Sequence, residues 1–206
     1  MDKGNRHTKS DVLDRLHAYQ KVASLKDIRW IERALQPEIS CVFLETGTLS
    51  AVKRYVNLFD RYGIPVFLHI EKIAGINTDR HGVEFLAHHV KPTGIITSKP
   101  KLVRYAQQYR LLSVLRMPLL DRESIDRGLK TVEESGPDIV QVLPASAAHF
   151  FQPVADGKSV PVIAGGLIET RGHAEDMLAS GALAVSTSSP ELWMYSFARK
   201  TEVKQS

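Results

Sequence analysis

The stretch Pro161-Val-Ile-Ala-Gly-Gly-Leu167 is followed, one helical segment later, by Gly181-Ala-Leu-Ala-Val-Ser-Thr-Ser-Ser189. Paired glycines after a strand let the backbone approach a ligand and present N–H groups to it. The hydroxyl-rich end of the second stretch leads into a short helix near Pro190, and helix N-termini attract phosphate. Phosphate sites formed by the loops after strands seven and eight recur in (β/α)₈ barrels. We therefore predict a phosphate-binding site at Gly165, Gly166, Ser186, Thr187 and Ser188. The alternative is a pair of tight turns with no ligand.

Short apolar runs precede these stretches at regular intervals, and longer segments of helical periodicity separate them. The eight runs are Val22–Leu25, Cys41–Leu44, Pro65–His69, Gly94–Thr97, Leu112–Leu115, Ile139–Leu143, Pro161–Ala164 and Ala182–Ser186. Their continuous apolar character is typical of parallel strands that are buried on both faces. Eight strand–helix units in about 180 residues favour a closed barrel over a doubly wound sheet.

The predicted helices lie between these runs, and their expected ends carry suitable residues. They are Ile28–Leu35, Leu49–Tyr62, Gly82–Val90, Leu102–Tyr109, Ser124–Glu134 and Arg171–Ser180, with Phe150–Ala155 a poor helix broken by Pro153. Asp121 can cap the helix that follows it, and Gly63, Gly136 and Gly181 stand where helices should end. We predict an α/β protein with a single TIM-like (β/α)₈ barrel domain over residues 21–198. Residues 1–20 form an extension, either a helix or a tail, and residues 199–206 a basic tail.

Composition and charge narrow the class of protein. The chain has 206 residues and a formal charge of +4, of which residues 1–21 and 199–206 each carry +2. Residues 22–198, the body of the protein, are therefore neutral, so the overall charge is weak evidence for nucleic-acid binding. Neither a membrane span of roughly 18 apolar residues nor a signal peptide is present, so we expect a cytoplasmic protein without membrane contact. The single cysteine, Cys41, is expected to be a small buried strand residue.

Polar residues just after the predicted strands are candidates for the rest of the ligand site, because barrel sites lie at the carboxyl ends of strands. The candidate pocket residues are Glu45, His69, Glu71, Arg116 and Gln141. His69 and Glu71 could contact the ligand or perform acid–base chemistry, or they could be a satisfied histidine and a solvated charge. Arg116 lies among apolar residues, so we expect it to face the mouth as an anion contact or as a partner of Glu45 or Glu71.

Metal binding and catalysis receive little support from the sequence. The adjacent His88 and His89 diverge on a helix and would not chelate one metal, and the chain has no cluster of Cys and His. We expect no cofactor and no catalytic residue. The candidate acid–base groups His69, Glu71, Lys72 and Glu45 lack a clear pair opposite the phosphate site.

The ordered set of motifs resembles the glycerol uptake operon antiterminator family across roughly residues 22–195. The resemblance is carried by Phe67-Leu-His-Ile-Glu71, Val90-Lys-Pro-Thr-Gly-Ile-Ile-Thr-Ser98, Arg116, Leu119-Leu-Asp121, Pro137-Asp-Ile-Val-Gln-Val-Leu-Pro144, Pro161-Val-Ile-Ala-Gly-Gly-Leu-Ile168 and Val185-Ser-Thr-Ser-Ser-Pro190. It implies a barrel that binds glycerol 3-phosphate and acts on leader mRNA to prevent termination. Gln141 stands where the family has an acid, Glu71 where it has Asp, Lys26 where it has Arg and Ala145 where Gly is common. The polyol end of the site therefore matches less well than the phosphate end.

Two functions remain in consideration. The first is a regulator that binds glycerol 3-phosphate or a similar small phosphate, binds leader mRNA, and is either a monomer or a homodimer. Its candidate RNA contacts are Lys53, Arg54, Lys99, Lys101, Arg104 and the two tails. The second is a small barrel enzyme, an isomerase, aldolase or phosphodiesterase, that acts on a phosphorylated metabolite. The absence of a convincing catalytic set favours the regulator.

Overall fold

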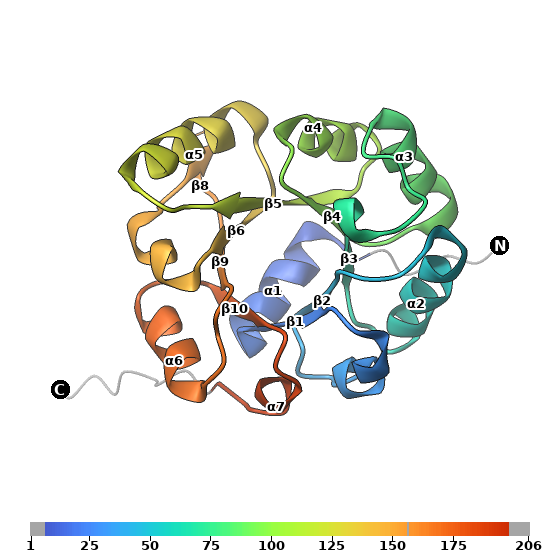
Figure 1. Ribbon diagram of the computed structural model, residues 1–206, viewed down its shortest axis with the longest axis horizontal. Helices are drawn as coiled ribbons and strands as arrows, with labels where there is room; N and C mark the ends of the chain where they lie inside the picture. Colours follow the sequence, from blue (N-terminus) through green and yellow to red (C-terminus); the bar gives the residue numbers. More distant parts are fainter. Residues whose placement is uncertain (1–6, 156, 198–206) are drawn as a thin grey trace.

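Eight parallel strands close into a barrel in the computed structural model, which describes residues 7–155 and 157–197 (Figure 1). The strands are β1 (Lys21–Leu25), β2 (Cys41–Leu44), β3 (Val66–His69), β4 (Gly94–Thr97), β5 (Leu112–Pro118), β6 (Ile139–Leu143), β9 (Val162–Gly165) and β10 (Ala184–Thr187). Each strand pairs with the barrel strand before it in the chain, and β10 closes the ring against β1. The predicted (β/α)₈ barrel is confirmed.

Alternate strand side chains face the barrel interior and the surrounding helices, and both sets are buried. On β2, Cys41 and Phe43 belong to the interior cluster, whereas Val42 and Leu44 pack with the helices. Phe43 and Phe67 meet edge to face inside the barrel, with ring centroids 6.0 Å apart. Burial on both faces explains why the strands appear in the sequence as continuous apolar runs. Cys41 is buried, as predicted.

An outer ring of helices covers the barrel. Its members are α2 (Leu49–Arg61), α3 (Arg80–Phe85) with its π-helical continuation η4 (Leu86–Val90), α4 (Pro100–Gln108), α5 (Arg122–Ser135), α6 (Arg171–Ala179) and the short α7 (Pro190–Trp193). Asp121 caps α5 by accepting a hydrogen bond from the Ser124 amide, and Gly136 ends it in a left-handed conformation. Both assignments agree with the sequence prediction. No helix in the described part of the chain could span a bilayer.

The predicted helix Ile28–Leu35 is wrong, and the segment Phe150–Ala155, expected to be a poor helix broken by Pro153, is not an α-helix either. Residues 28–35 form two 3₁₀ turns, η1 (Ile28–Trp30) and η2 (Glu32–Ala34), rather than one α-helix. Pro37 disfavours helical geometry at the preceding residue, and the chain must turn back within a few residues to begin β2. After β6 the chain forms the 3₁₀ segment η5 (Ala145–Phe150) and a two-stranded hairpin, β7 (Val154–Ala155) and β8 (Lys158–Ser159).

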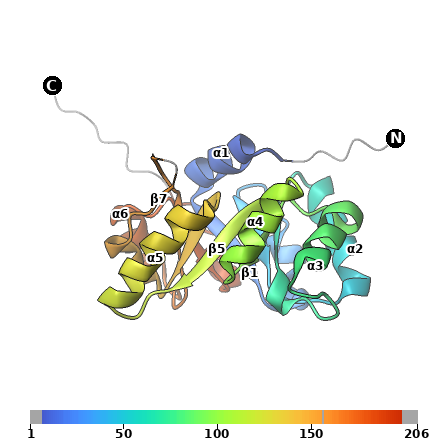
Figure 2. The same ribbon diagram turned by 90° about the horizontal axis from the view of Figure 1, so that it is seen from above.

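The amino-terminal extension contains a helix, α1 (Lys9–Tyr19), that lies across one end of the barrel (Figures 1 and 2). Because α1 runs directly into β1, it covers the end at which the strands begin. Val12 and Leu16 are fully buried in the interior cluster. Arg15 donates hydrogen bonds to the carbonyls of Pro37, Ile39 and Ser40 and so fixes the helix to the segment before β2. The predicted basic tail, residues 199–206, lies outside the described residues.

Candidate functional site

An ion pair joins opposite parts of the barrel at the carboxyl ends of the strands. Glu45 follows β2 directly, and Arg116 lies in the second half of β5. Arg116 donates from Nη2 to Oε1 of Glu45 at 2.7 Å and from Nη1 to Oε2 at 3.1 Å. The two side chains are only 16% and 5% exposed. Arg116 therefore faces the mouth and pairs with Glu45, one of the two partners that the sequence predicted.

The same guanidinium continues the network toward the last strands. Arg116 donates from Nε to Oε1 of Gln141 at 2.7 Å, and Gln141 donates from Nε2 to Oγ of Ser186 at 2.7 Å. Gln141 and Ser186 are almost completely buried. Side chains from β5, β6 and β10 are thus held in one chain of hydrogen bonds with Glu45. This arrangement fixes the positions of the polar groups at the mouth.

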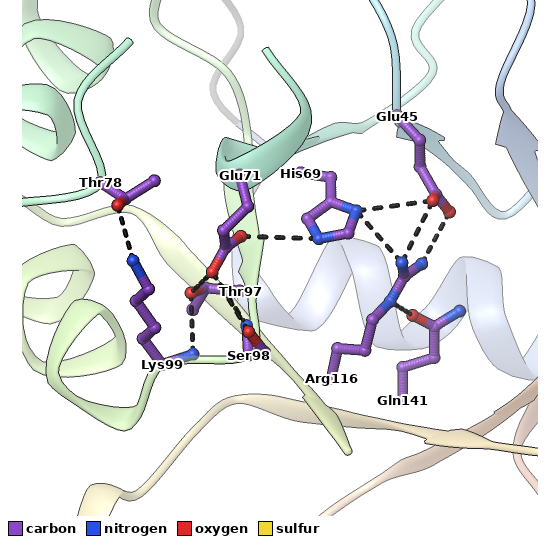
Figure 3. A network of polar contacts seen from close by, with 9 residues as sticks. All are labelled: Glu45, His69, Glu71, Thr78, Thr97, Ser98, Lys99, Arg116 and Gln141. Atoms are coloured by element: carbon purple, nitrogen blue, oxygen red, sulfur yellow. Dashed lines mark hydrogen bonds and ion pairs between the residues drawn. The ribbon is translucent and has the colours of Figure 1, made fainter. Parts of the chain in front are cut away.

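On its other side the network reaches β3 and the start of α4 (Figure 3). Nδ1 of His69 lies 3.1 Å from Nη1 of Arg116 and 3.4 Å from Oε2 of Glu45. Its Nε2 lies 3.5 Å from Oε2 of Glu71. Oε1 of Glu71 accepts hydrogen bonds from Oγ1 of Thr97 at 2.5 Å and from the amide of Ser98 at 3.1 Å. Contacts therefore connect Gln141 to the loop that precedes α4.

Glu45 is held in its charged form. Burial opposes that charge, but hydrogen bonds from His69 and Arg116, together with the positive charge of Arg116, outweigh burial and lower the pKa of Glu45 to about 2. A carboxylate with so low a pKa is a weak general base at neutral pH. Glu45 is therefore better suited to accepting hydrogen bonds than to moving protons.

A cavity of about 210 Å³ opens beside this network at the carboxyl ends of the strands. Its lining contains seven of the ten predicted site residues: Glu45, Arg116, Gln141, Gly166, Ser186, Thr187 and Ser188. Gly165 precedes the lining residue Gly166 but is not itself part of the lining. His69 and Glu71 are likewise outside the lining: His69 contacts the lining residues Arg116 and Glu45, and Glu71 contacts His69.

The loop after β9 brings backbone to the edge of this cavity. Gly166 has φ of +77°, and Leu167, with φ of +59°, is a left-handed non-glycine residue whose side chain is 78% exposed. Gly165 has a different role, because a Cβ there would lie 2.5 Å from Oγ of Ser186 and 2.7 Å from Nε2 of Gln141. The absence of a side chain at Gly165 makes room for the buried Gln141–Ser186 hydrogen bond.

The hydroxyls of the last strand are partly committed to structure. Oγ1 of Thr187 donates to the carbonyl of Ile168 at 2.7 Å and accepts a bond from the amide of Ser189 at 3.1 Å. Thr187 thus ties the loop after β9 to the loop after β10. Lys26 and Ser188 also line the cavity, and their side chains have no hydrogen-bond partner in the described parts of the chain. An ammonium and loop backbone at one end suit a small anion.

The sequence did not single out every lining residue. Ser24, Leu143 and Glu169 line the cavity but were not selected as site residues. Ser24 lies within the first apolar run, and only the alternation of inward and outward side chains could have indicated that it faces the mouth. Glu169 lies four residues beyond Gly165, so its place depends on the path of the loop.

A sequence model of the glycerol-3-phosphate responsive antiterminator family matches residues 21–193. The chain belongs to this family. The matched range covers all eight barrel strands and every residue that lines the cavity. The family is one of regulators of transcription antitermination that respond to glycerol 3-phosphate.

Solved structures of similar proteins agree with the antiterminator assignment. A glycerol uptake operon antiterminator-related protein from Thermotoga maritima is 29% identical, with a TM-score of 0.74, over 86% of this chain and 99% of that one. A glycerol uptake operon antiterminator regulatory protein from Listeria monocytogenes is 25% identical, with a TM-score of 0.74, over 84% and 94%. A deoxyribose phosphate aldolase from Aeropyrum pernix, 15% identical with a TM-score of 0.64 over 90% and 96%, shares the fold.

Proposed function

We propose that this antiterminator binds glycerol 3-phosphate in the cavity at the barrel mouth and that the ligand sets its affinity for the leader mRNA of glycerol-utilisation genes. The observation that carries the proposal is the cavity itself. It combines an exposed lysine and a glycine loop at one side with a fixed array of Arg116, Glu45 and Gln141 at the other. An anionic group with a polar, hydroxyl-bearing remainder matches these two ends.

The phosphate belongs beside Lys26, Gly166 and Ser188. Lys26 supplies positive charge, and backbone N–H groups of the glycine loop can donate hydrogen bonds to phosphate oxygens. The hydroxyl groups then face Glu45, Arg116 and Gln141. Each carboxylate oxygen of Glu45 already accepts from Arg116, but it retains a lone pair that can accept a ligand hydroxyl.

Ligand control of RNA binding requires two states with different ligand affinity. A ligand oxygen that takes a hydrogen bond from Arg116 competes with Glu45 for the same guanidinium, beside which the ring of His69 lies. The contacts of His69 with Glu71, and of Glu71 with Thr97 and Ser98, would then change. We propose this network as the bistable element that links the cavity to the outer surface near α4.

A barrel enzyme acting on a phosphorylated metabolite is the alternative, because the aldolase shares the fold. Two observations weigh against it. Schiff-base catalysis needs a lysine desolvated at the reacting centre, whereas Lys26, the one lysine that lines the cavity among residues 7–155 and 157–197, is exposed. Glu45, held as a carboxylate by Arg116, is a poor proton acceptor. Prolonged incubation with glycerol 3-phosphate, followed by product analysis, tests this alternative directly.

Ligand binding is tested by thermal unfolding in glycerol 3-phosphate, with glycerol and inorganic phosphate as separate comparisons. A ligand at 100 times its dissociation constant should add about 2.7 kcal/mol to the free energy of unfolding. Gly166→Asp should abolish the effect, because its carboxylate repels phosphate and its Cβ would lie 3.1 Å from Cδ2 of Leu143. Gly172→Asp is the matched control, since a Cβ there meets nothing within 4 Å. Equal stabilisation of both variants would refute the assigned site.

A further inference from the structure

Positive charge is concentrated on one half of the barrel. Residues 46–111 contain ten Lys and Arg and four Asp and Glu, a formal charge of +6, whereas residues 112–198 contain six Lys and Arg and eleven Asp and Glu, a charge of −5. The zero net charge of residues 22–198 therefore conceals one positive and one negative half. The positive half includes α2, α3, η4 and α4, which follow one another around one side of the barrel (Figure 1).

Many of these cations lie on neighbouring helices. The helices pack side by side, η4 against α2 and α3 against α4. All ten Lys and Arg of residues 46–111 are exposed. We call the outer surface of α2, α3, η4 and α4 the basic face, and its helical cations are Lys53, Arg54, Arg61, Arg80, Lys101 and Arg104.

The cations of the basic face are not neutralised. Among the residues that the structure describes, none of the ten forms an ion pair with a carboxylate. On the opposite half, by contrast, Arg122, Arg127, Lys130 and Arg171 each pair with an acid on their own helix. A surface that leaves its cations without carboxylates can bind the phosphates of a polyanion.

The same segments carry exposed aromatic rings. Tyr62 at the end of α2 is 58% exposed, and Phe85 on α3 is 38% exposed. The rings of Phe85 and His89 lie 4.8 Å apart. Single-stranded nucleic acids bind to grooves and faces in which cations contact the backbone and rings stack on unpaired bases. Bases in a duplex are already stacked on one another and would not use these rings.

We propose that the basic face is the surface that contacts the leader mRNA and that it binds a single-stranded part of it. This inference rests on the proposed function, and it specifies where and in what form the RNA binds. The face also borders the polar network of the cavity. The amide of Lys99 donates to Oγ1 of Thr97, and its ammonium donates to Oγ1 of Thr78, so the network ends at the start of α4. The proposed ligand site and the proposed RNA surface therefore lie at the two ends of one polar network.

The test compares two triple variants that remove the same charge. The basic-face variant loses three cations of that face and carries Lys53→Gln, Arg54→Gln and Lys101→Gln. The α5 variant loses three exposed cations of α5 and carries Arg122→Gln, Arg127→Gln and Lys130→Gln. Binding of leader RNA is measured across a salt series, with thermal unfolding to show that both variants fold. The basic-face variant should bind the RNA more weakly. The slope of log K against log salt should become less steep by about 2, because each of the three lost phosphate contacts with a single strand contributes about 0.7. The α5 variant should match the wild type.

If wild-type protein binds the RNA and the two variants weaken equally, or only the α5 variant weakens, the basic face is not the contact surface. If wild-type protein binds no leader RNA with or without glycerol 3-phosphate, the proposed function itself fails. Tyr62→Ala tests the stacking: it should weaken binding of oligouridine several-fold and leave binding of a duplex RNA unchanged. Equal loss for both probes would overturn the single-strand assignment.

Discussion

Arg116 on β5 holds Glu45, the residue after β2, through two hydrogen bonds of 2.7 and 3.1 Å across the mouth of the barrel. Arg116→Gln would leave a carboxylate that is 5% exposed without its counter-charge. Loss of one partner of such a pair costs about 3–5 kcal/mol. We expect a fall of that size in the free energy of unfolding, measured with urea at neutral pH. Adding Glu45→Gln should restore most of it, and a double variant as unstable as the summed single variants would contradict the pairing.

Acid should remove the contribution of Glu45 to stability. The pKa of Glu45 lies below its ordinary value of 4.5, at about 2, so the folded state binds the proton more weakly than the unfolded state. The stabilisation is therefore complete above pH 4.5 and is lost as the pH falls toward 2, with a magnitude on the order of 3 kcal/mol. The measurement is the difference in urea stability between wild type and Glu45→Gln across this range. A difference that stays constant or grows on acidification would show that another interaction sets it.

Gly165→Ala should destabilise the protein although alanine is only one methyl group larger. The new Cβ would lie 2.5 Å from Oγ of Ser186 and 2.7 Å from Nε2 of Gln141, so their buried hydrogen bond must shift. Overpacking of this kind costs about 1–3 kcal/mol. Gly172→Ala is the control, because it lies in α6 with nothing within 4 Å and should be neutral or stabilising. Equal denaturation midpoints for the two variants would show that the strand ends have room to adjust.

Most of the fold could be predicted because its determinants are local. Strands buried on both faces produce apolar runs, and each predicted strand overlaps an observed one. Residues 28–35 were mispredicted because three apolar residues at helical spacing say nothing about how soon the chain must turn back. Pro37 was the available evidence against a long helix there.

The sequence predicted which residues belong to the site better than it predicted which of them contact one another. Placement at the carboxyl ends of strands identified Glu45, Arg116 and Gln141. The bond between Gln141 and Ser186, residues 45 positions apart, depends on strand register and could not be read from spacing. The charge asymmetry between residues 46–111 and 112–198 is present in the sequence, but the net charge of residues 22–198 is zero and conceals it. The structure adds that the helices of the positive range lie side by side.

The helix α1 should be part of the stable core. Leu16 is fully buried against the interior cluster of the barrel, so Leu16→Ala should cost about 2–5 kcal/mol in free energy of unfolding. Asp14→Ala, on the exposed side of the same helix, should change stability by less than about 0.5 kcal/mol. Urea denaturation of both variants tests this. Similar small effects would mean that α1 adds little to the barrel.

In our proposal, one small phosphate bound in the barrel mouth controls RNA binding. The most direct measurement is the dissociation constant of the leader RNA without glycerol 3-phosphate and at a saturating concentration of it, for wild type and for Gly166→Asp. We expect the ligand to change the dissociation constant of the wild type by about 5–150-fold, in one direction or the other, and to leave that of Gly166→Asp unchanged. The same RNA affinity in both conditions for wild-type protein that binds glycerol 3-phosphate would contradict it.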